Sequence, residues 1–223
     1  KILNTSFNNT IAKKIPYSLN GKNRFFSLNS TKLYDENYDT LISLDDILLK
    51  GKHNLSNFIA SATAAKILNV KNKKIKKTME LFTGIKHRLQ FVKNIGGSSY
   101  FNDSKATNIS SVIAAINSFN APIILLLGGK NKDSDFRLLL PHTKRHVKHI
   151  VSFGEAGGEI ATAIGDAVRL DIKSSLNQAV ASAHKIASPG DIILMSPGCA
   201  SFDEFKNFED RGEKFIKMVN ELK

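Results

Sequence analysis

Cysteine and long apolar runs are scarce in this chain of 223 residues. Cys199 is the only cysteine, so no disulfide can form within the chain, and a reducing compartment is the expected setting. Cys199 is either a catalytic thiol or a small, half-buried structural residue. The longest apolar runs, at 123–127 and 192–195, are too short to cross a bilayer and too far from the N-terminus to form a signal peptide. We therefore expect a cytoplasmic protein with no membrane partner.

Two nucleotide-binding motifs are also missing. Nowhere does the sequence contain Gly-x-x-x-x-Gly-Lys-Ser/Thr, the loop that cradles phosphates in many ATP-binding proteins. Glycines 154, 157 and 158 follow a predicted strand, but their spacing differs from the Gly-x-Gly-x-x-Gly dinucleotide fingerprint. We read them as a strand-to-helix turn and reject a nicotinamide cofactor.

The formal charge of +12 is concentrated in the first part of the chain. Residues 1–82 hold 14 Lys and Arg against 6 Asp and Glu, whereas residues 83–223 hold 18 against 14. Much of the excess is one run, made of Lys71, Lys73, Lys74, Lys76 and Lys77. No aromatic residues interleave this run for base stacking, so a solvated helix face is favoured over a nucleic-acid site. A basic enzyme also suits anionic small molecules such as nucleotides.

Hydrophobic patterning divides the chain in two. Residues 1–49 alternate apolar and polar residues in short runs, broken by turn residues at 20–23 and 35–37, which is typical of a β-meander. Two helices are predicted next, at 54–69 and 72–82. Thr83-Gly84 ends the second helix. We therefore expect domains at residues 1–82 and 83–223.

From Gln90 onward, short apolar strands alternate with amphipathic helices. The predicted strands are 91–93, 99–101, 123–127, 149–153, 168–170 and 191–195. The predicted helices are 108–119, 134–140, 155–164, 175–187 and 207–221. This alternation predicts an α/β fold, with a Rossmann-like, mostly parallel sheet covered by helices on both faces.

Polar turns follow three of these strands, at 102–105, 128–132 and 197–202. Right-handed crossovers place such turns on one edge of the sheet, where ligands bind in open α/β sheets. Lys105 and Lys132 offer ammonium groups there, suited to a carboxylate or a phosphate. Thr107 is a plausible N-cap for the following helix. Ser201 begins either a capping box or a loop that precedes a later helix start at Asn207.

The segment Asn102-Asp103-Ser104-Lys105-Ala106-Thr107-Asn108 resembles the signature of the bacterial Mur ligases. It is most similar to the members that add D-glutamate, because sister ligases carry Tyr-Ala-His or Tyr-Asn-Ala in place of Ser-Lys-Ala. The similarity covers roughly residues 50–223. Further matches follow in the same order: Gly51-Lys52-His53-Asn54 with Asn57, Thr83-Gly84, His87-Arg88, Leu125-Leu126-Leu127-Gly128-Gly129 with Lys132, Ser196-Pro197, Cys199-Ala200-Ser201-Phe202-Asp203, Phe205-Lys206-Asn207-Phe208-Glu209 and Arg211-Gly212.

The resemblance implies an ATP-dependent, carboxylate-amine ligase of peptidoglycan precursor synthesis, with ATP and Mg²⁺ as cofactors. ATP would phosphorylate the carboxylate of UDP-N-acetylmuramoyl-L-alanine, and the D-glutamate amine would attack the acyl phosphate. Residues 1–82 would end the central ATP-binding domain, and residues 83–223 would bind D-glutamate and part of ATP. Because the phosphate loop is missing, we expect the C-terminal part of a longer, monomeric ligase, inactive alone, whose metal ligands lie outside this segment.

The resemblance also assigns roles to individual residues, with Lys105 neutralising charge near the reacting phosphate. D-glutamate would be held by Lys132, Thr107, Ser201, Phe202 and the backbone of Phe208. The adenosine part of ATP would be bound by Asn54, Asn57, Arg88 and Asp103. Cys199 would lie in a structural turn. Two alternatives stay open: a ligase similar to folylpolyglutamate synthase that uses L-glutamate, and a free-standing basic module that binds nucleotides or nucleic acid.

Overall fold

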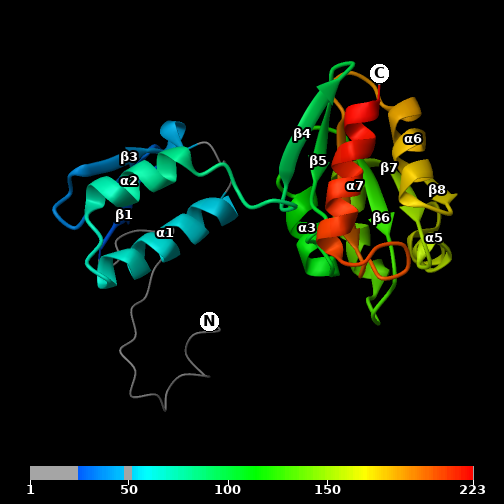
Figure 1. Ribbon diagram of the computed structural model, residues 1–223, viewed down its shortest axis with the longest axis horizontal. Coiled ribbons are helices and arrows are strands. Elements are labelled where there is room, and N and C mark those ends of the chain that lie inside the picture. The colour runs from blue at the N-terminus through cyan, green and yellow to red at the C-terminus, as the bar shows by residue number, and fades with distance from the viewer. Residues whose placement is uncertain (1–24, 48–51, 223) are drawn as a thin grey trace, which may run out of the picture. The chain divides into compact units, whose positions relative to one another are not determined.

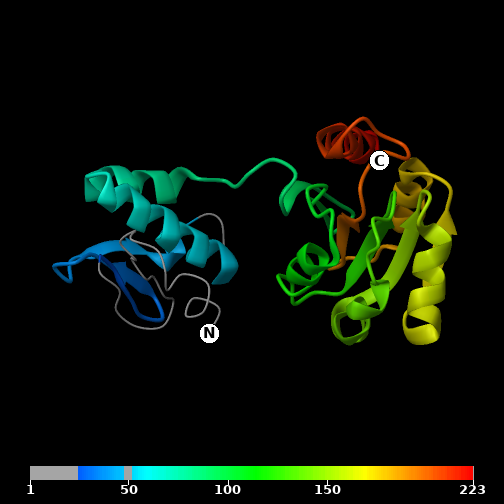
Figure 2. The same cartoon turned by 90° about the horizontal axis from the view of Figure 1, so that it is seen from below.

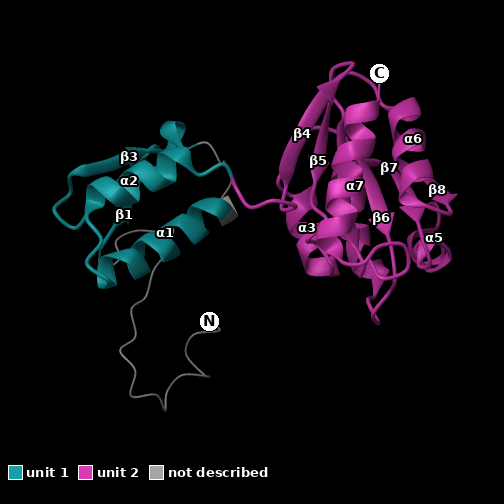
Figure 3. Ribbon diagram, in the orientation of Figure 1, with its two compact units in different colours: residues 1–83 teal, residues 84–223 magenta. Residues whose placement is uncertain are grey.

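The computed structural model describes residues 25–47 and 52–222. It divides into two compact units, Lys1–Thr83 and Gly84–Lys223 (Figure 3). The division falls one residue from the domain boundary predicted from the sequence, and the roles given to the two domains stay predictions.

Unit 1 begins with a three-stranded antiparallel sheet in the order β1-β2-β3. Its strands are β1 (Ser27–Leu28), β2 (Lys32–Tyr34) and β3 (Thr40–Ser43), and a short 3₁₀ turn, η2 (Leu44–Asp46), follows. The Asp35 carboxylate shapes the turn between β2 and β3, because it accepts hydrogen bonds from the backbone of Asn37 and Asp39, both at 3.0 Å. The predicted meander is confirmed over this part, whereas its earlier runs and the turn at 20–23 lie outside the described residues.

Two helices follow in unit 1, α1 (Lys52–Ile67) and α2 (Asn72–Leu81). Both pack on the small sheet: Ile75 and Met79, four residues apart on α2, are buried in one cluster with Ile59 of α1 and Leu33 of β2. The lysines of the basic run, one at the N-cap of α2 and the others on the helix, are all exposed. The lysine run is therefore exposed, and its interpretation as a solvated face without nucleic acid stays a prediction.

Unit 2 is built on a six-stranded sheet in the order β4-β5-β9-β6-β7-β8 (Figure 1). β4 and β5 form an antiparallel hairpin, and all other neighbours are parallel. The mostly parallel sheet is confirmed. Its strands are β4 (Gln90–Ile95), β5 (Ser98–Asn102), β6 (Ile123–Gly128), β7 (Val147–Phe153), β8 (Leu170–Lys173) and β9 (Ile192–Gly198).

Helices cover both faces of this sheet, and Figure 2 shows α3 and α7 on opposite sides of it. One face carries α3 (Ile109–Ile116), η3 (Phe136–Leu139), α4 (Leu140–His146) and α5 (Gly157–Ile164), which a short 3₁₀ turn, η4 (Gly165–Ala167), follows. The other face carries α6 (Leu176–Ile186) and α7 (Phe208–Glu221). No helix in the described ranges is long and apolar enough to cross a membrane.

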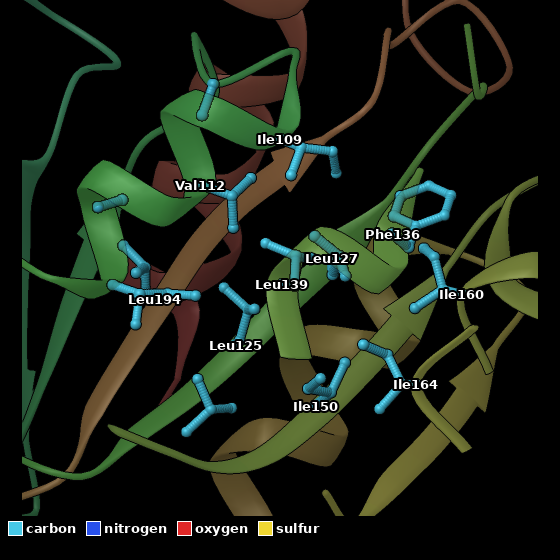
Figure 4. Packing of buried hydrophobic residues seen from close by; sticks show 14 of the residues in the cluster. Ile109, Val112, Leu125, Leu127, Phe136, Leu139, Ile150, Ile160, Ile164 and Leu194 are labelled. Atoms are coloured by element: carbon cyan, nitrogen blue, oxygen red, sulfur yellow. The ribbon is translucent and has the colours of Figure 1, made fainter. Parts of the chain in front are cut away.

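The central strand β6 is buried on both sides, and its residues 123–127 have no exposed surface. Leu125 and Leu127 belong to the cluster under α3, whereas Ile124 and Leu126 belong to the cluster under α6 and α7. A continuous apolar run is therefore what a doubly covered parallel strand requires. Figure 4 shows the first cluster, to which strands and helices contribute Ile109, Val112, Leu125, Leu127, Phe136, Leu139, Ile150, Ile160, Ile164 and Leu194.

Two helix boundaries differ from the prediction. The helix predicted at 134–140 is a 3₁₀ turn that continues as α4 to His146, because Pro141 occupies the first turn of α4, where a missing N–H costs nothing. Thr107 was predicted to cap α3, but the cap is Asn108, whose side chain accepts a hydrogen bond from the Ser111 backbone at 2.9 Å.

The strand predicted at 168–170 is also displaced. A 3₁₀ turn occupies 165–167, and Val168 is buried against the core before the strand begins. β8 starts only at Leu170, which pairs with Ile150 of β7. Val168, on which the strand prediction partly rests, is therefore a core residue at the end of the preceding 3₁₀ turn.

Candidate ligand site at the carboxyl edge of the sheet

The loops after β5, β6 and β9 meet at one edge of the sheet, as predicted. The Asp103 backbone N–H donates to the Met195 carbonyl, and the Gly198 N–H donates to the Ala106 carbonyl, both at 2.8 Å. Lys130 and Ala200 exchange two backbone hydrogen bonds at 2.9 and 3.0 Å. Direct backbone bonds therefore fix the loop after β9 against its two neighbours.

The loop after β7 joins the same cluster. The Glu155 N–H donates to the Asp203 carboxylate at 3.1 Å, and the Ala156 N–H donates to the Gly129 carbonyl at 2.8 Å. Four strand ends therefore contribute to one cluster of loops, in which residues from 102–107, 128–132, 154–156 and 197–206 lie together.

Arg211 of α7 lies beneath this cluster and is fully buried. Its guanidinium donates to the Ser104 hydroxyl and carbonyl, both at 2.9 Å, and to the carbonyls of Cys199 and Ala200, at 3.2 and 3.3 Å. Burial lowers the pKa of Arg211 to about 10, so the side chain stays charged at neutral pH. The sequence alone gives Arg211 no role, because three of its four acceptors are backbone carbonyls, which no sequence pattern marks.

Asp103 is also buried, with 5% of its surface exposed. Its carboxylate accepts hydrogen bonds from the Ser196 hydroxyl at 2.8 Å and from the Leu89 backbone at 3.1 Å. Burial raises the pKa of Asp103 to about 6, against the lowering effects of these bonds and of the Arg88 charge. Arg88 itself is exposed. The Arg88 charge therefore acts on the predicted Asp103 carboxylate only as a minor influence on its pKa.

The two predicted lysines each lie over an aromatic ring. The Lys105 ammonium is 4.5 Å from the centre of the Phe208 ring, and the Lys132 ammonium is 5.3 Å from that of Phe202. Both lysines are exposed, and Phe202 is 62% exposed. Both cations thus lie beside aromatic residues that follow β9.

Two further residues predicted to bind D-glutamate, Ser201 and Thr107, lie after β9 and before α3. Ser201 is 2% exposed and lies in a loop, because α7 starts only at Phe208, with Asn207 as its N-cap. The loop interpretation of this segment is therefore confirmed. Thr107 is exposed, one residue before the α3 cap.

Asn54 and Asn57 lie on α1 in unit 1, so they belong to a different unit from the loop cluster. Asn57 is exposed and Asn54 is half-buried. Their predicted part in ATP binding stays a prediction.

Cys199 has the environment of a structural residue. Its side chain is 1% exposed, and burial raises the pKa of its thiol to about 12. A thiol of this kind is neutral at physiological pH, whereas a nucleophile needs the thiolate. Over residues 25–47 and 52–222, no group of three or more His, Cys, Asp or Glu side chains is arranged to hold a metal ion.

The fold and the loop cluster define an α/β domain with cationic side chains at the ligand-binding edge of its sheet. A family model described as "Mur ligase, glutamate ligase domain" matches residues 87–199. The chain therefore belongs to the Mur ligase family, through its glutamate ligase domain.

Curated relatives agree with this assignment. The chain is 41% identical over 186 residues to the UDP-N-acetylmuramoylalanine--D-glutamate ligase of Bacillus cytotoxicus, an alignment that covers 82% of this chain and 41% of the relative. It is 43% identical over 190 residues to the ligase of the same name from a Geobacillus species, covering 84% and 42%. The chain thus spans about two-fifths of the length of these relatives.

Two solved structures share the fold at low sequence identity. MurF from Acinetobacter baumannii has a TM-score of 0.61 at 18% identity, covering 83% of this chain and 42% of that one. FolC from E. coli, in complex with DHPP and ADP, has a TM-score of 0.60 at 18% identity, covering 87% and 45%.

We expect removal of the Arg211 guanidinium to loosen the loop cluster. The Arg211→Met variant removes the guanidinium donors of the buried Ser104 and Cys199 carbonyls and of the Ser104 hydroxyl, and one of the two donors of the Ala200 carbonyl. The free energy of unfolding should therefore fall by about 3 kcal/mol or more. Arg137→Met is the matched control, because Arg137 is exposed and pairs only with Asp135; a change within about 0.5 kcal/mol is expected there. Urea denaturation measures the free energy of unfolding of both variants. A loss below about 1 kcal/mol for Arg211→Met would contradict the stabilising role of Arg211.

The raised pKa of Asp103 predicts a pH dependence of stability. Between about pH 4 and pH 6 the folded state holds a proton that the unfolded carboxylate has released, so stability falls as pH rises through this window and levels off above it. Asp103→Asn keeps the size and shape of the side chain but cannot titrate. The decline in the free energy of unfolding with pH, on the order of 2–3 kcal/mol, should therefore be absent in this variant. Urea denaturation at several pH values tests this, and identical pH profiles for the two proteins would refute it.

Proposed function

We propose that this chain is the part of an ATP-dependent ligase that binds D-glutamate and adds it to UDP-N-acetylmuramoyl-L-alanine in peptidoglycan precursor synthesis. The observation that carries the proposal is the position of Lys105 and Lys132, which follow β5 and β6, the two strands that flank β9, and lie in the loop cluster. The identity of about 40% to ligases named for this reaction supports the same substrate.

In the proposed reaction, ATP phosphorylates the carboxylate of UDP-N-acetylmuramoyl-L-alanine, and the D-glutamate amine attacks the acyl phosphate with loss of phosphate. Lys132, Thr107, Ser201 and Phe202 hold the two carboxylates of D-glutamate, together with the backbone of Phe208. Lys105 neutralises charge near the reacting phosphate. A preorganised cation of this kind commonly contributes about 10²–10³ in rate.

The residues proposed to bind the adenosine part of ATP are Asp103 and Arg88 of unit 2 and Asn54 and Asn57 of unit 1. The buried Asp103 carboxylate is ionised at neutral pH, because its pKa is about 6, and an ionised carboxylate accepts hydrogen bonds from sugar hydroxyls. No described cluster fits Mg²⁺, so no step is assigned to the metal here. We infer that the metal and phosphate loop belong to other parts of the full ligase, and that this chain alone does not turn over.

We also propose a cytoplasmic setting, because ATP is consumed and the single cysteine suits a reducing compartment. The proposed partners are small molecules, and the full enzyme acts as a monomer without nucleic acid. The lysine run on α2 has no interleaved aromatic residues, which supports this view over a nucleic-acid module. A salt-dependent gel shift with DNA or RNA would support that module instead.

A ligase that uses L-glutamate is the second candidate, favoured by the likeness of the fold to FolC. The Ser-Lys-Ala sequence at residues 104–106 favours D-glutamate. Competition between the two enantiomers in the full-length ligase separates the candidates: we expect phosphate release with UDP-N-acetylmuramoyl-L-alanine and ATP to depend on D-glutamate. A preference for L-glutamate would refute the proposal.

Removal of the Lys132 ammonium should weaken D-glutamate binding specifically. A charge-assisted hydrogen bond of this kind is worth about 10- to 100-fold in affinity, so Lys132→Ala should raise the KM for D-glutamate by that factor. Lys130→Ala is the matched control, because Lys130 lies two residues away and pairs with Glu155 at the surface. Equal effects of the two substitutions on KM would exclude a direct contact by Lys132.

A further inference from the structure

Lys105, the proposed catalytic lysine, lies against the side chain of Phe208, a residue whose backbone alone has a proposed role so far. Its ammonium lies over the Phe208 ring, 4.5 Å from the ring centre. The lysine side chain is otherwise exposed, at the tip of a polar turn. A four-carbon side chain in such a place samples many rotamers, and a fixed aromatic face narrows that sampling.

The Phe208 ring packs against His87, and hydrogen bonds to their backbone hold both residues next to the turn that carries Lys105. The His87 ring packs edge-to-face against it, with centroids 6.3 Å apart and planes at 80°. The Phe208 carbonyl accepts a hydrogen bond from the Ser104 hydroxyl at 2.8 Å, and the His87 carbonyl accepts one from the Lys105 backbone at 3.0 Å. The turn that carries Lys105 is therefore hydrogen-bonded to the backbone of both aromatic residues.

His87 is in turn fixed by Asn102. The Asn102 carbonyl oxygen accepts a hydrogen bond from the Ser104 N–H, so its amide nitrogen faces His87 and donates to Nδ1 at 3.0 Å. His87 is 4% exposed, and burial lowers its pKa, which favours the neutral ring that can accept this bond. Gly212 completes the packing, because a Cβ at that position would overlap the imidazole.

These contacts form a continuous column from Asn102 through His87 and Phe208 to Lys105. We propose that the Phe208 ring is a positioning residue, which holds the Lys105 ammonium at the sheet edge where the reacting phosphate is expected. This inference rests on the proposed function of Lys105. Phe208 would then have two roles: its ring positions Lys105, and its backbone contacts D-glutamate.

The contact itself can be tested by NMR on the 223-residue chain with isotope-labelled lysine. The face of an aromatic ring shields nearby protons, so the ε-methylene protons of Lys105 should resonate upfield and move to the ordinary lysine position in Phe208→Leu. Lys214 lies 5.1 Å from the centre of the Phe205 ring and serves as the matched control, because its signal should not respond to Phe208→Leu. An unshifted Lys105 signal in the unsubstituted chain would overturn the inference.

The functional consequence is tested by a double-mutant cycle in the full-length ligase. Phe208→Leu should lower kcat by about 3- to 30-fold, the range expected for a cation–π contact, and leave the KM for D-glutamate nearly unchanged. The same substitution should have no further effect once Lys105→Gln is present, whereas Phe208→Tyr, which keeps the ring, should retain most of the rate. Lys214→Gln should leave kcat unchanged.

The outcomes separate this inference from the proposed function. If Phe208→Leu lowers kcat by the same factor with and without Lys105, the ring acts on something other than the lysine and the inference fails alone. An effect confined to the KM for D-glutamate would overturn it too. If Lys105→Gln is fully active, the catalytic role of Lys105 and the inference fail together.

Discussion

A single buried guanidinium holds the ligand edge of unit 2 together. Arg211 reaches from α7 to the loops after β5 and β9, where it donates hydrogen bonds to the carbonyls of Ser104, Cys199 and Ala200. A charge with no exposed surface is costly unless its donors are matched, and here at least four acceptors surround it. The loops that carry Lys105 and Ser201 therefore have one defined arrangement relative to each other.

The strand order of the sheet determines which loops lie close enough to meet at Arg211. β9 lies between β5 and β6, so residues from three distant parts of the sequence end side by side. The backbone pairing of Lys130 with Ala200 then extends the sheet edge into the loops. Cations on two of these loops lie against phenylalanines that follow β9, which brings positive charge and apolar surface together at this edge of the sheet.

Much of this arrangement follows from local patterns in the sequence. The apolar run at 123–127 predicts a doubly covered strand, and the order of strands and helices predicts the shared edge of Lys105 and Lys132. The α3 cap at Asn108 and the extension of α4 beyond Pro141 were missed, because either of two adjacent residues can cap a helix and proline can begin one as well as end one. Arg211 gave no signal, because its partners are mostly backbone carbonyls distant in sequence.

The central claim is that D-glutamate binds at this edge of the sheet. A crystal structure of the full-length ligase with D-glutamate tests it most directly. We expect a substrate carboxylate oxygen within about 2.7–3.1 Å of the Lys132 ammonium, and the second carboxylate in the loop at 201–208. D-glutamate bound away from the loops after β6 and β9 would contradict the account.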